Sequence, residues 1–468
     1  MKMLYTGIRR IAGPLLFLSS VPGVGYDHLA EITTPEGEIR RGRVIAISEE
    51  FLCLQVFEGT AGLGKTQTSV SFTGRPLTLP LSGELLGRSF DGGGRPIDGL
   101  GPIFPEERRE IGGSPLNPLS REYPRNCIYT GISAIDCAIT LIRGQKLPIF
   151  SGAGLPHNQL AAQILRQARV EDGDSPFAIV FAAMGVGHDV AAYFQENFQK
   201  AGVLHRVSMF LNLASHPIVE RLLTPRLALT AAEYLAFTRG YHVLVILTDM
   251  AAYCEALREY AASKGDIPSR RAFPSYMYSD LASLYERAGI LRNHPGSLTL
   301  MPILSMPGDD ISHPIPDLTG YITEGQIVLS RDLHLGGVYP PVAILESLSR
   351  LMKDGIGEGR TRPHHPQLAN QLFSCYARVR EARSLESLLG HDELSPLDQK
   401  YIEFGRGLEG EFLAQNHGES RSLDQSLTIL LNLFRLLPRS ELNRLDKALL
   451  DQYHHEDIPH DKTSAHQS

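Results

Sequence analysis

The fold is decided by the stretch Lys146-Leu147-Pro148-Ile149-Phe150-Ser151-Gly152-Ala153-Gly154-Leu155-Pro156-His157-Asn158. This stretch predicts a buried strand over 146–150, a loop over 151–158 and a helix that begins at Asn158. Further continuous apolar runs, typical of strands covered on both faces, occur at 177–183, 207–211 and 242–247. Helical patterns separate these runs. The repeated strand–helix–strand units therefore predict a three-layer α/β domain with a parallel sheet.

The loop over 151–158 has the position of a phosphate-binding loop but not its residues. The positions that would bind phosphate and magnesium are held by Ser151, Gly152, Gly154, Pro156, His157 and Asn158. Pro156 removes an N–H donor, His157 replaces the permanently charged lysine of the motif, and Asn158 replaces its Ser or Thr. A hydrogen bond to a charged group is worth about 1.5–3 kcal/mol. We therefore predict a degenerate loop that binds Mg-ATP more weakly by orders of magnitude.

Two further positions decide whether such a pocket could hydrolyse ATP. The apolar strand that begins at His242 ends in Asp249, the place of a Walker B carboxylate that orients magnesium. Val186 stands after the strand over 177–183, where a hydrolysing protein would place a glutamate. Alternatively, Asp249 is a structural residue that caps a neighbouring backbone at the end of its strand. We predict a chain that is itself non-catalytic, with no metal and no cofactor of its own.

A complete phosphate-loop string occurs elsewhere, at Gly59-Thr60-Ala61-Gly62-Leu63-Gly64-Lys65-Thr66. A working loop of this kind needs a helix directly after it, because the helix N-terminus faces the phosphate. Here residues 67–74 have the pattern of a strand and a turn. We predict a Gly-rich hairpin in a β-barrel rather than a nucleotide site.

The 468 residues are enough for about three domains. Short alternating strands predict a β-barrel over 1–75, closed because closure leaves no strand edge exposed. The α/β domain is predicted over 76–356, with a Gly- and Pro-rich connector at 80–125 and a helix that starts at Thr224-Pro225. Helical periodicity predicts a bundle over 357–456, followed by a polar tail over 457–468. The predicted helices of the bundle cover 367–390, 396–415 and 422–454.

Composition excludes several classes of protein. The 45 basic and 52 acidic residues give a net charge of −7, which argues against a nucleic-acid-binding surface. The five cysteines form no Cys-x-x-Cys pair, so we expect neither a disulfide framework nor a zinc knuckle. No stretch approaches the roughly 20 apolar residues of a membrane helix. We therefore expect a cytoplasmic protein that reaches a membrane only through partners.

Nearly the whole chain resembles the B (beta) subunits of V- and A-type rotary ATPases, or ATP synthases. The blocks that carry the resemblance are 55–60, 129–136, 143–157, 229–236 and 314–327. The degenerate loop over 151–158 is itself characteristic of B chains, whereas catalytic A chains carry an intact loop. The resemblance implies a RecA-like P-loop NTPase fold for the central domain, between the barrel and the bundle.

The resemblance also implies a function and partners. B subunits are non-catalytic, regulatory subunits that alternate with catalytic A subunits in a hexameric head, where Mg-ATP or Mg-ADP is shared at the interface. The head couples ATP synthesis or hydrolysis to transport of H+ or Na+. The implied partners are the A subunit, the central rotor stalk and the peripheral stalk. Contact with the membrane sector is only indirect, on the cytoplasmic face.

One residue of this chain is implied to act in the partner's site. The stretch Ser347-Leu348-Ser349-Arg350 matches the family's arginine-finger segment, so Arg350 is expected to reach in trans into the A-subunit site. Such a finger can be worth 10³–10⁵ in rate. Without the resemblance, Arg350 has the pattern of a surface ion-pair residue. Just upstream, Ala343 and Glu346 depart from the family's common Asp and Pro.

Two other functions fit part of the pattern. A catalytic secretion-type ATPase would need a lysine at position 157 and a glutamate near position 186, and both are missing. A RecA-like ring motor acting on nucleic acid would need a basic surface, which the acidic balance of the chain disfavours.

Overall fold

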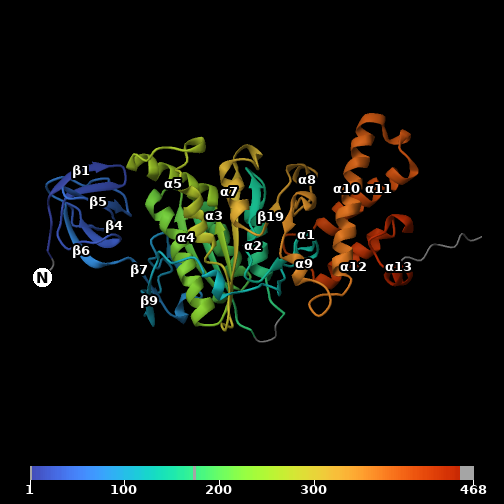
Figure 1. Ribbon diagram of the computed structural model, residues 1–468, viewed down its shortest axis with the longest axis horizontal. Helices are drawn as coiled ribbons and strands as arrows, with labels where there is room; N and C mark the ends of the chain where they lie inside the picture. Colours follow the sequence, from blue (N-terminus) through green and yellow to red (C-terminus); the bar gives the residue numbers. More distant parts are fainter. Residues whose placement is uncertain (1–2, 172–174, 454–468) are drawn as a thin grey trace, which may run out of the picture.

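The computed structural model describes residues 3–171 and 175–453, which form three parts in a row (Figure 1). An antiparallel β-barrel is followed by an α/β domain with a mainly parallel sheet and then by a helical domain, as the sequence predicts. The predicted tail over 457–468 lies outside the described residues. Within the described ranges, no helix is long and apolar enough to cross a membrane.

The barrel closes through the segment before its first strand. Its strands pair in the order β1-β2-β5-β4-β3-β6, and alternate side chains such as Leu16, Val44 and Leu54 fill a small apolar core. Tyr5 exchanges two backbone hydrogen bonds with Val70 of β6, at 2.8 and 2.9 Å, which joins the two ends of the sheet. The strands are β1 (Ile8–Ala12), β2 (Leu15–Ser19), β3 (His28–Thr33), β4 (Ile39–Ile47), β5 (Phe51–Val56) and β6 (Ser69–Pro76).

The Gly-rich segment 59–66 is not a hairpin, so that prediction was wrong. It connects β5 to β6, but β5 pairs with β2 and β4, whereas β6 pairs with β3. The segment therefore crosses between strands that are not neighbours. Its carbonyls are tied to the barrel by Arg40, whose guanidinium donates to Gly59 O at 3.0 Å and Ala61 O at 2.6 Å. The element that follows the segment is the strand β6, not a helix.

The central sheet is buried on both faces. Its strand order is β20-β19-β13-β18-β16-β14-β15-β8. On β14, Phe181 packs into the core on one face and Val180 into the core on the other, because neighbouring residues of a strand point to opposite sides. The strands are β8 (Ser89–Asp91), β13 (Ile149–Gly152), β14 (Phe177–Val186), β15 (Val207–Leu213), β16 (His242–Thr248), β18 (Ser297–Met306), β19 (Gly325–Val328) and β20 (Leu348–Ser349).

Helices cover each face of this sheet. One face packs against α2 (His157–Gln167) and α3 (His188–Lys200). The other packs against α4 (Ile218–Glu233), α5 (Met250–Lys264), α6 (Met277–Tyr285) and α7 (Pro314–Ile322). The Gly- and Pro-rich segment 80–125 is more than a connector, because β8 pairs in parallel with β15 at the sheet edge.

The helix α4 does not begin at Thr224-Pro225, so that prediction was also wrong. It begins at Ile218, directly after Pro217, and Pro225 lies inside it. A proline in a helix interior costs about 3 kcal/mol. Apolar burial along α4 offsets this cost, since Leu223 and Leu227 are almost completely buried.

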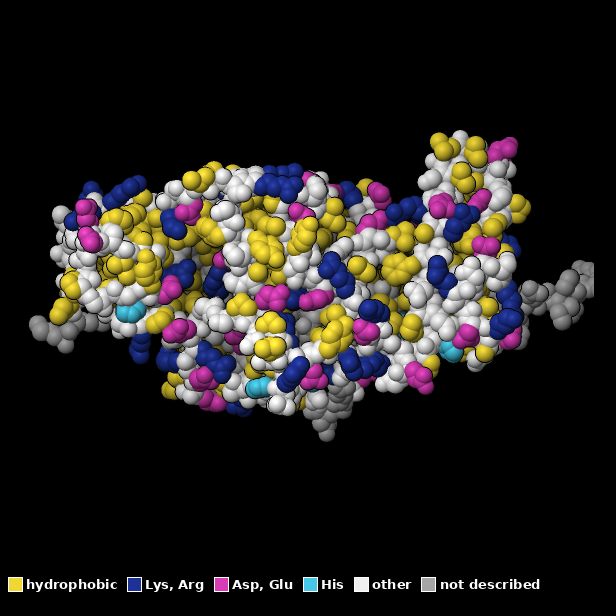
Figure 2. Space-filling view, viewed as in Figure 1, with side chains coloured by type: hydrophobic (Ala, Val, Ile, Leu, Met, Phe, Trp, Pro, Cys, Tyr) yellow, Lys and Arg dark blue, Asp and Glu magenta, His cyan; other side chains and the backbone are white. Residues whose placement is uncertain are grey.

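The helical domain consists of α10 (His365–Leu389), α11 (Pro396–Gly407), the π-helix η9 (Leu408–Leu413), α12 (Leu423–Phe434) and α13 (Lys447–Tyr453). The helix predicted over 422–454 is interrupted after Phe434, because Pro438 cannot continue it. The C-terminal end of α10 and the N-terminal end of α11 project together away from the body of the molecule (Figure 1). Hydrophobic side chains lie on this tip in Figure 2. Leu388 and Leu389 at the end of α10 are 79% and 59% exposed.

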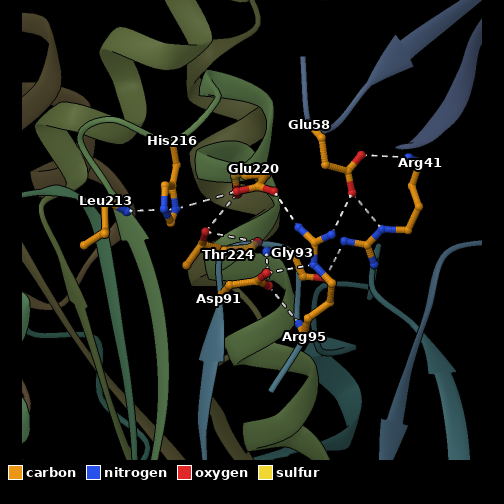
Figure 3. A network of polar contacts seen from close by, with 10 residues as sticks. Arg41, Glu58, Asp91, Gly93, Arg95, Leu213, His216, Glu220 and Thr224 are labelled. Carbon is orange, nitrogen blue, oxygen red and sulfur yellow. Dashed lines mark hydrogen bonds and ion pairs between the residues drawn. The ribbon is translucent and has the colours of Figure 1, made fainter. Parts of the chain in front are cut away.

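A polar network joins the barrel to the central domain (Figure 3). Arg41 on β4 donates through its backbone N and its Nε to the carboxylate of Glu58, at 2.7 and 3.0 Å. Its Nη2 also donates to Gly93 O at 3.2 Å. Arg95 lies 3.5 Å from Glu58 and 3.3 Å from Glu220 on α4. These ion pairs fix the position of the barrel on the central sheet.

Glu220 makes this joint sensitive to pH. Burial, together with repulsion by Asp91, raises the pKa of Glu220 from 4.5 to about 7, and Arg95 only partly opposes the shift. The folded chain then binds this proton more tightly than the unfolded chain. Its contribution to the free energy of unfolding is therefore present below pH 4.5 and is lost as pH rises through about 7.

We expect Glu220→Gln, which mimics the protonated group, to raise the melting temperature relative to the unmodified chain. The increase should be larger at about pH 8, where Glu220 is charged, than at about pH 5, where it is protonated. Glu196→Gln, at the exposed Glu196–Lys200 pair on α3, is the matched control and should show no such trend. Equal shifts of the Glu220→Gln melting temperature at both pH values would contradict the assignment.

Candidate functional site

The loop over 151–158 lies between β13 and α2, at the carboxyl end of the central sheet, where α/β proteins place their ligands. Gly154 adopts φ +79°, which the tight turn requires. Two backbone N–H groups of the loop are used internally. Leu155 N donates to Gly152 O at 3.2 Å, and His157 N donates to Leu155 O at 2.9 Å. Since Pro156 has no N–H, residues 155–157 of the loop offer no free backbone donor to a phosphate.

His157 does not replace the missing lysine. It is the first residue of α2, and its Nδ1 lies 3.0 Å from Ser151 Oγ. Burial lowers the pKa of His157, although the carboxylate of Asp249 opposes this effect. The imidazole is therefore neutral at pH 7 and offers a phosphate no fixed positive charge.

An ion pair covers the loop at Gly152. Arg331, the first residue of α8 (Arg331–Leu335), donates to Asp309 Oδ2 at 2.6 Å and to Ala153 O at 2.9 Å. A Cβ atom at Gly152 would lie only 2.2 Å from Asp309 Oδ1, so the carboxylate is in contact with the loop. The ion pair therefore occupies the space beside Gly152, and the charges of its two partners largely offset each other there. No sequence pattern predicts this pair, because both residues lie more than a hundred positions from the loop.

Asp249 has the geometry of a structural residue that caps a neighbouring backbone, rather than that of a free Walker B carboxylate. Its Oδ1 accepts hydrogen bonds from Ala251 N at 2.8 Å, as the N-cap of α5, and from Ser305 N at 3.1 Å. Val186, at the position where a hydrolysing protein would place a glutamate, is the last residue of β14. Within the described part of the chain, no group of three or more His, Cys, Asp or Glu residues is arranged to hold a metal ion.

Arg350 follows a strand whose side chains alternate between the interior and the surface. Ser347 Oγ donates to Ala343 O at 2.7 Å and accepts from Val328 N at 2.9 Å. Ser349 is also buried, whereas Leu348 and Arg350 are exposed. The two serines anchor the segment, so the arginine is directed outward.

The guanidinium of Arg350 lies at the exposed surface of the chain. Across residues 3–171 and 175–453, it has no hydrogen-bond or ion-pair partner. It borders a shallow hollow of about 380 Å³ that is also lined by Ile311 and Tyr321, which are 47% and 76% exposed. An unpartnered arginine beside exposed apolar side chains has the composition of a protein interface.

Arg350 is not brought to the loop of its own chain. Its backbone N donates to Glu324 O at 3.0 Å, at the amino end of β19. The loop over 151–158 follows the carboxyl end of β13, which runs parallel to β19. The backbone of Arg350 therefore lies toward the amino ends of these two neighbouring strands, whereas the loop lies at their carboxyl ends. The Arg350 side chain borders the same hollow as Phe150, the residue before the loop.

Ala343 and Glu346, which depart from the common Asp and Pro of the B subunits, each have a defined contact in the structure. Ala343 is buried and supplies the carbonyl that Ser347 binds. Glu346 ends the 3-10 helix η7 (Ile344–Glu346) and forms an ion pair with Arg380 on α10. Within the described residues, neither side chain forms a hydrogen bond or an ion pair with Arg350, and both leave the anchoring serines in place.

Three family models together match most of the chain. Residues 131–349 match the nucleotide-binding domain of the ATP synthase alpha/beta family, and residues 8–74 match the beta-barrel domain of the same family. Residues 354–454 match the C-terminal domain of V and A type ATP synthase.

Individual proteins are similar over nearly their whole length. The V-type ATP synthase beta chain of Halothermothrix orenii is 56% identical over 450 residues, covering 96% of this chain and 97% of the relative. V-type ATP synthase beta chain 2 of Clostridium tetani is 54% identical over 459 residues, covering 98% and 100%. The solved structure of a unique ATP synthase subunit, NeqB, from Nanoarcheaum equitans superposes with a TM-score of 0.72 at 39% identity, covering 90% of this chain and 98% of that one.

Proposed function

The chain belongs to the ATP synthase alpha/beta family, among the B (beta) subunits of V/A-type ATPases, and we propose that it is a non-catalytic, regulatory subunit that completes a neighbour's ATP site. The observation that carries the proposal is the state of its own loop. His157 is neutral, Pro156 donates nothing, and the carboxylate of Asp309 lies against Gly152. A site of this kind neither attracts Mg-ATP nor stabilises a transferring phosphoryl group.

The contribution of the chain to catalysis in the neighbouring subunit is then to supply Arg350 in trans. This arginine is exposed and its side chain has no partner among the described residues. A planar guanidinium can bind γ-phosphate oxygens in a bidentate manner as negative charge redistributes in the transition state. These features support the assignment of Arg350 as an arginine finger in the site of a catalytic A subunit.

The proposed assembly is a hexameric head of three A and three B subunits. Mg-ATP or Mg-ADP is held mainly by the A subunit at the interface, so the B chain has no cofactor of its own. The head binds the central rotor stalk and the peripheral stalk, and it couples ATP synthesis or hydrolysis to H+ or Na+ transport. The chain is then peripheral, on the cytoplasmic face of the membrane, and reaches the membrane sector only through these partners.

The first test uses the purified chain alone and the complex reconstituted with its A subunit. We expect no steady-state hydrolysis of Mg-ATP by the isolated chain, and turnover only after the A subunit is added. Titration calorimetry of the isolated chain with Mg-ATP and Mg-ADP should give no saturable binding up to roughly 1 mM nucleotide. Hydrolysis by the isolated chain at a rate comparable to that of the complex would overturn the proposal.

A further inference from the structure

The strand that carries Arg350 is too short to hold its own position. β20 has two residues, and it pairs with β19 only through Gly325↔Ser349 and Gln326↔Leu348. So few ladder bonds do not fix a chain segment by themselves. Because the guanidinium of Arg350 has no partner within the described chain, its position depends on what holds this backbone.

The side chain of Gln145 supplies that support. This residue lies between β12 (Leu141–Ile142) and β13 and is completely buried. Its Nε2 donates to Glu324 O at 3.0 Å and to Ser349 Oγ at 3.0 Å, and its Oε1 accepts from Ile142 N at 2.9 Å. A backbone N–H can only donate and a backbone carbonyl can only accept, so these partners fix the orientation of the amide. One side chain thus ties together three separate segments.

The same contacts lead directly to Arg350. Glu324 O accepts hydrogen bonds from both Gln145 Nε2 and the backbone N of Arg350, the latter at 3.0 Å. Ser349 Oγ, which Gln145 also binds, donates to Thr140 O at 2.9 Å. The backbones of β19 and β20 are in close contact here, because a Cβ at Gly325 would lie 2.0 Å from Leu348 O. The segment therefore has little room to move while Gln145 is in place.

We propose that Gln145 is a positioning residue that sets where the Arg350 guanidinium enters the neighbouring subunit's site. The inference rests on the proposed function of Arg350. A finger that stabilises a transition state must be placed accurately, and a displacement of about 1 Å can cost on the order of 10²-fold in rate. Gln145 is completely buried, so its effect must pass through the backbone of Ser349 and Arg350.

The test compares two buried glutamines in the reconstituted complex. Gln145→Met keeps the side-chain volume and removes the three hydrogen bonds. Gln371→Met on α10 is the matched control, because Gln371 is equally buried and its amide bonds Glu441 O at 3.1 Å and Arg444 N at 2.9 Å. Both variants should lower the melting temperature. Only Gln145→Met should lower turnover per assembled complex, by about 10–100-fold, with the KM for ATP changed less than about threefold.

Combination with Arg350→Ala separates positioning from general damage. In the Arg350→Ala background, Gln145→Met should cause no further loss of turnover, since the residue it positions is already absent. Additive losses would overturn the proposal, because Gln145 would then act on something other than Arg350. Turnover of Gln145→Met equal to that of Gln371→Met, with Arg350→Ala impaired, would overturn it and leave the function of Arg350 intact. Normal turnover of Arg350→Ala would instead overturn the proposed function itself.

A second variant applies if Gln145→Met does not assemble. Ser349→Ala removes the hydroxyl that joins Gln145 to β20 and leaves the Gln145–Glu324 bond in place. We expect a loss of turnover of about 3–10-fold that again disappears in the Arg350→Ala background. Normal turnover of Ser349→Ala would overturn the proposal.

Discussion

Arg350→Ala is expected to lower ATP turnover per assembled complex by about 10³-fold or more, without preventing assembly of the hexamer. The reason is electrostatic. The guanidinium is permanently charged and has no competing partner among the described residues, so its whole charge is available to the neighbouring site. Negative charge redistributes on the phosphoryl oxygens in the transition state, and a positioned cation stabilises it there.

Arg350→Lys should be less damaging than Arg350→Ala. Lysine keeps the charge but loses the planar fork that binds two oxygens at once. The affinity of the interface for nucleotide should change less than the turnover in both variants, because the contact strengthens mainly in the transition state. Steady-state kinetics and nucleotide titration on the same complexes, after size-exclusion separation, measure both quantities.

A matched control is Arg75→Ala on β6, which removes another exposed arginine with no side-chain partner in the described chain. This variant should turn over within about twofold of the unmodified complex. Near-normal turnover in intact Arg350→Ala hexamers would end the arginine-finger assignment. Dissociation of the ring, with normal turnover in whatever assembles, would make Arg350 a structural interface residue instead.

The parts of the fold that depend on local sequence could be predicted. The apolar runs at 177–183 and 242–247 became β14 and β16, because continuous burial is a property of the strand itself. The loss of the phosphate site was also visible in single residues. A proline without an N–H and a histidine without a fixed charge carry their consequences wherever the loop lies.

The parts that depend on distant contacts could not be predicted. The pairing of β6 with β3 rather than β5 turned an expected hairpin into a crossing loop. Pro225 lies within a helix because burial of α4 outweighs its local cost. The ion pair of Asp309 and Arg331 over Gly152 joins residues whose proximity only the folded sheet determines. Each difference comes from tertiary contacts that no sequence window contains.

The block 229–236 carried part of the family resemblance, and the structure gives Glu233 within it a stabilising role. Arg287 is completely buried, and both oxygens of Glu233 bind it, through Nε and Nη2 at 2.6 Å each. Thr230 Oγ1 accepts a further bond from Nη2 at 2.9 Å. Glu233 is thus the acidic partner that allows a guanidinium to be buried between α4 and the end of α6.

We expect Glu233→Gln to destabilise the central domain by about 3–5 kcal/mol, because it leaves the charge of Arg287 buried without compensation. Glu196→Gln on α3 is the control: the pair it breaks, with Lys200, is exposed on both sides and should cost about 0.5 kcal/mol or less. Urea unfolding of the purified chain, followed by far-UV circular dichroism, compares the two variants directly. If Glu233→Gln unfolds at the same urea concentration as Glu196→Gln, the Arg287 charge is compensated by other groups. The high similarity of the block 229–236 to the family would then need a reason other than burial of this ion pair.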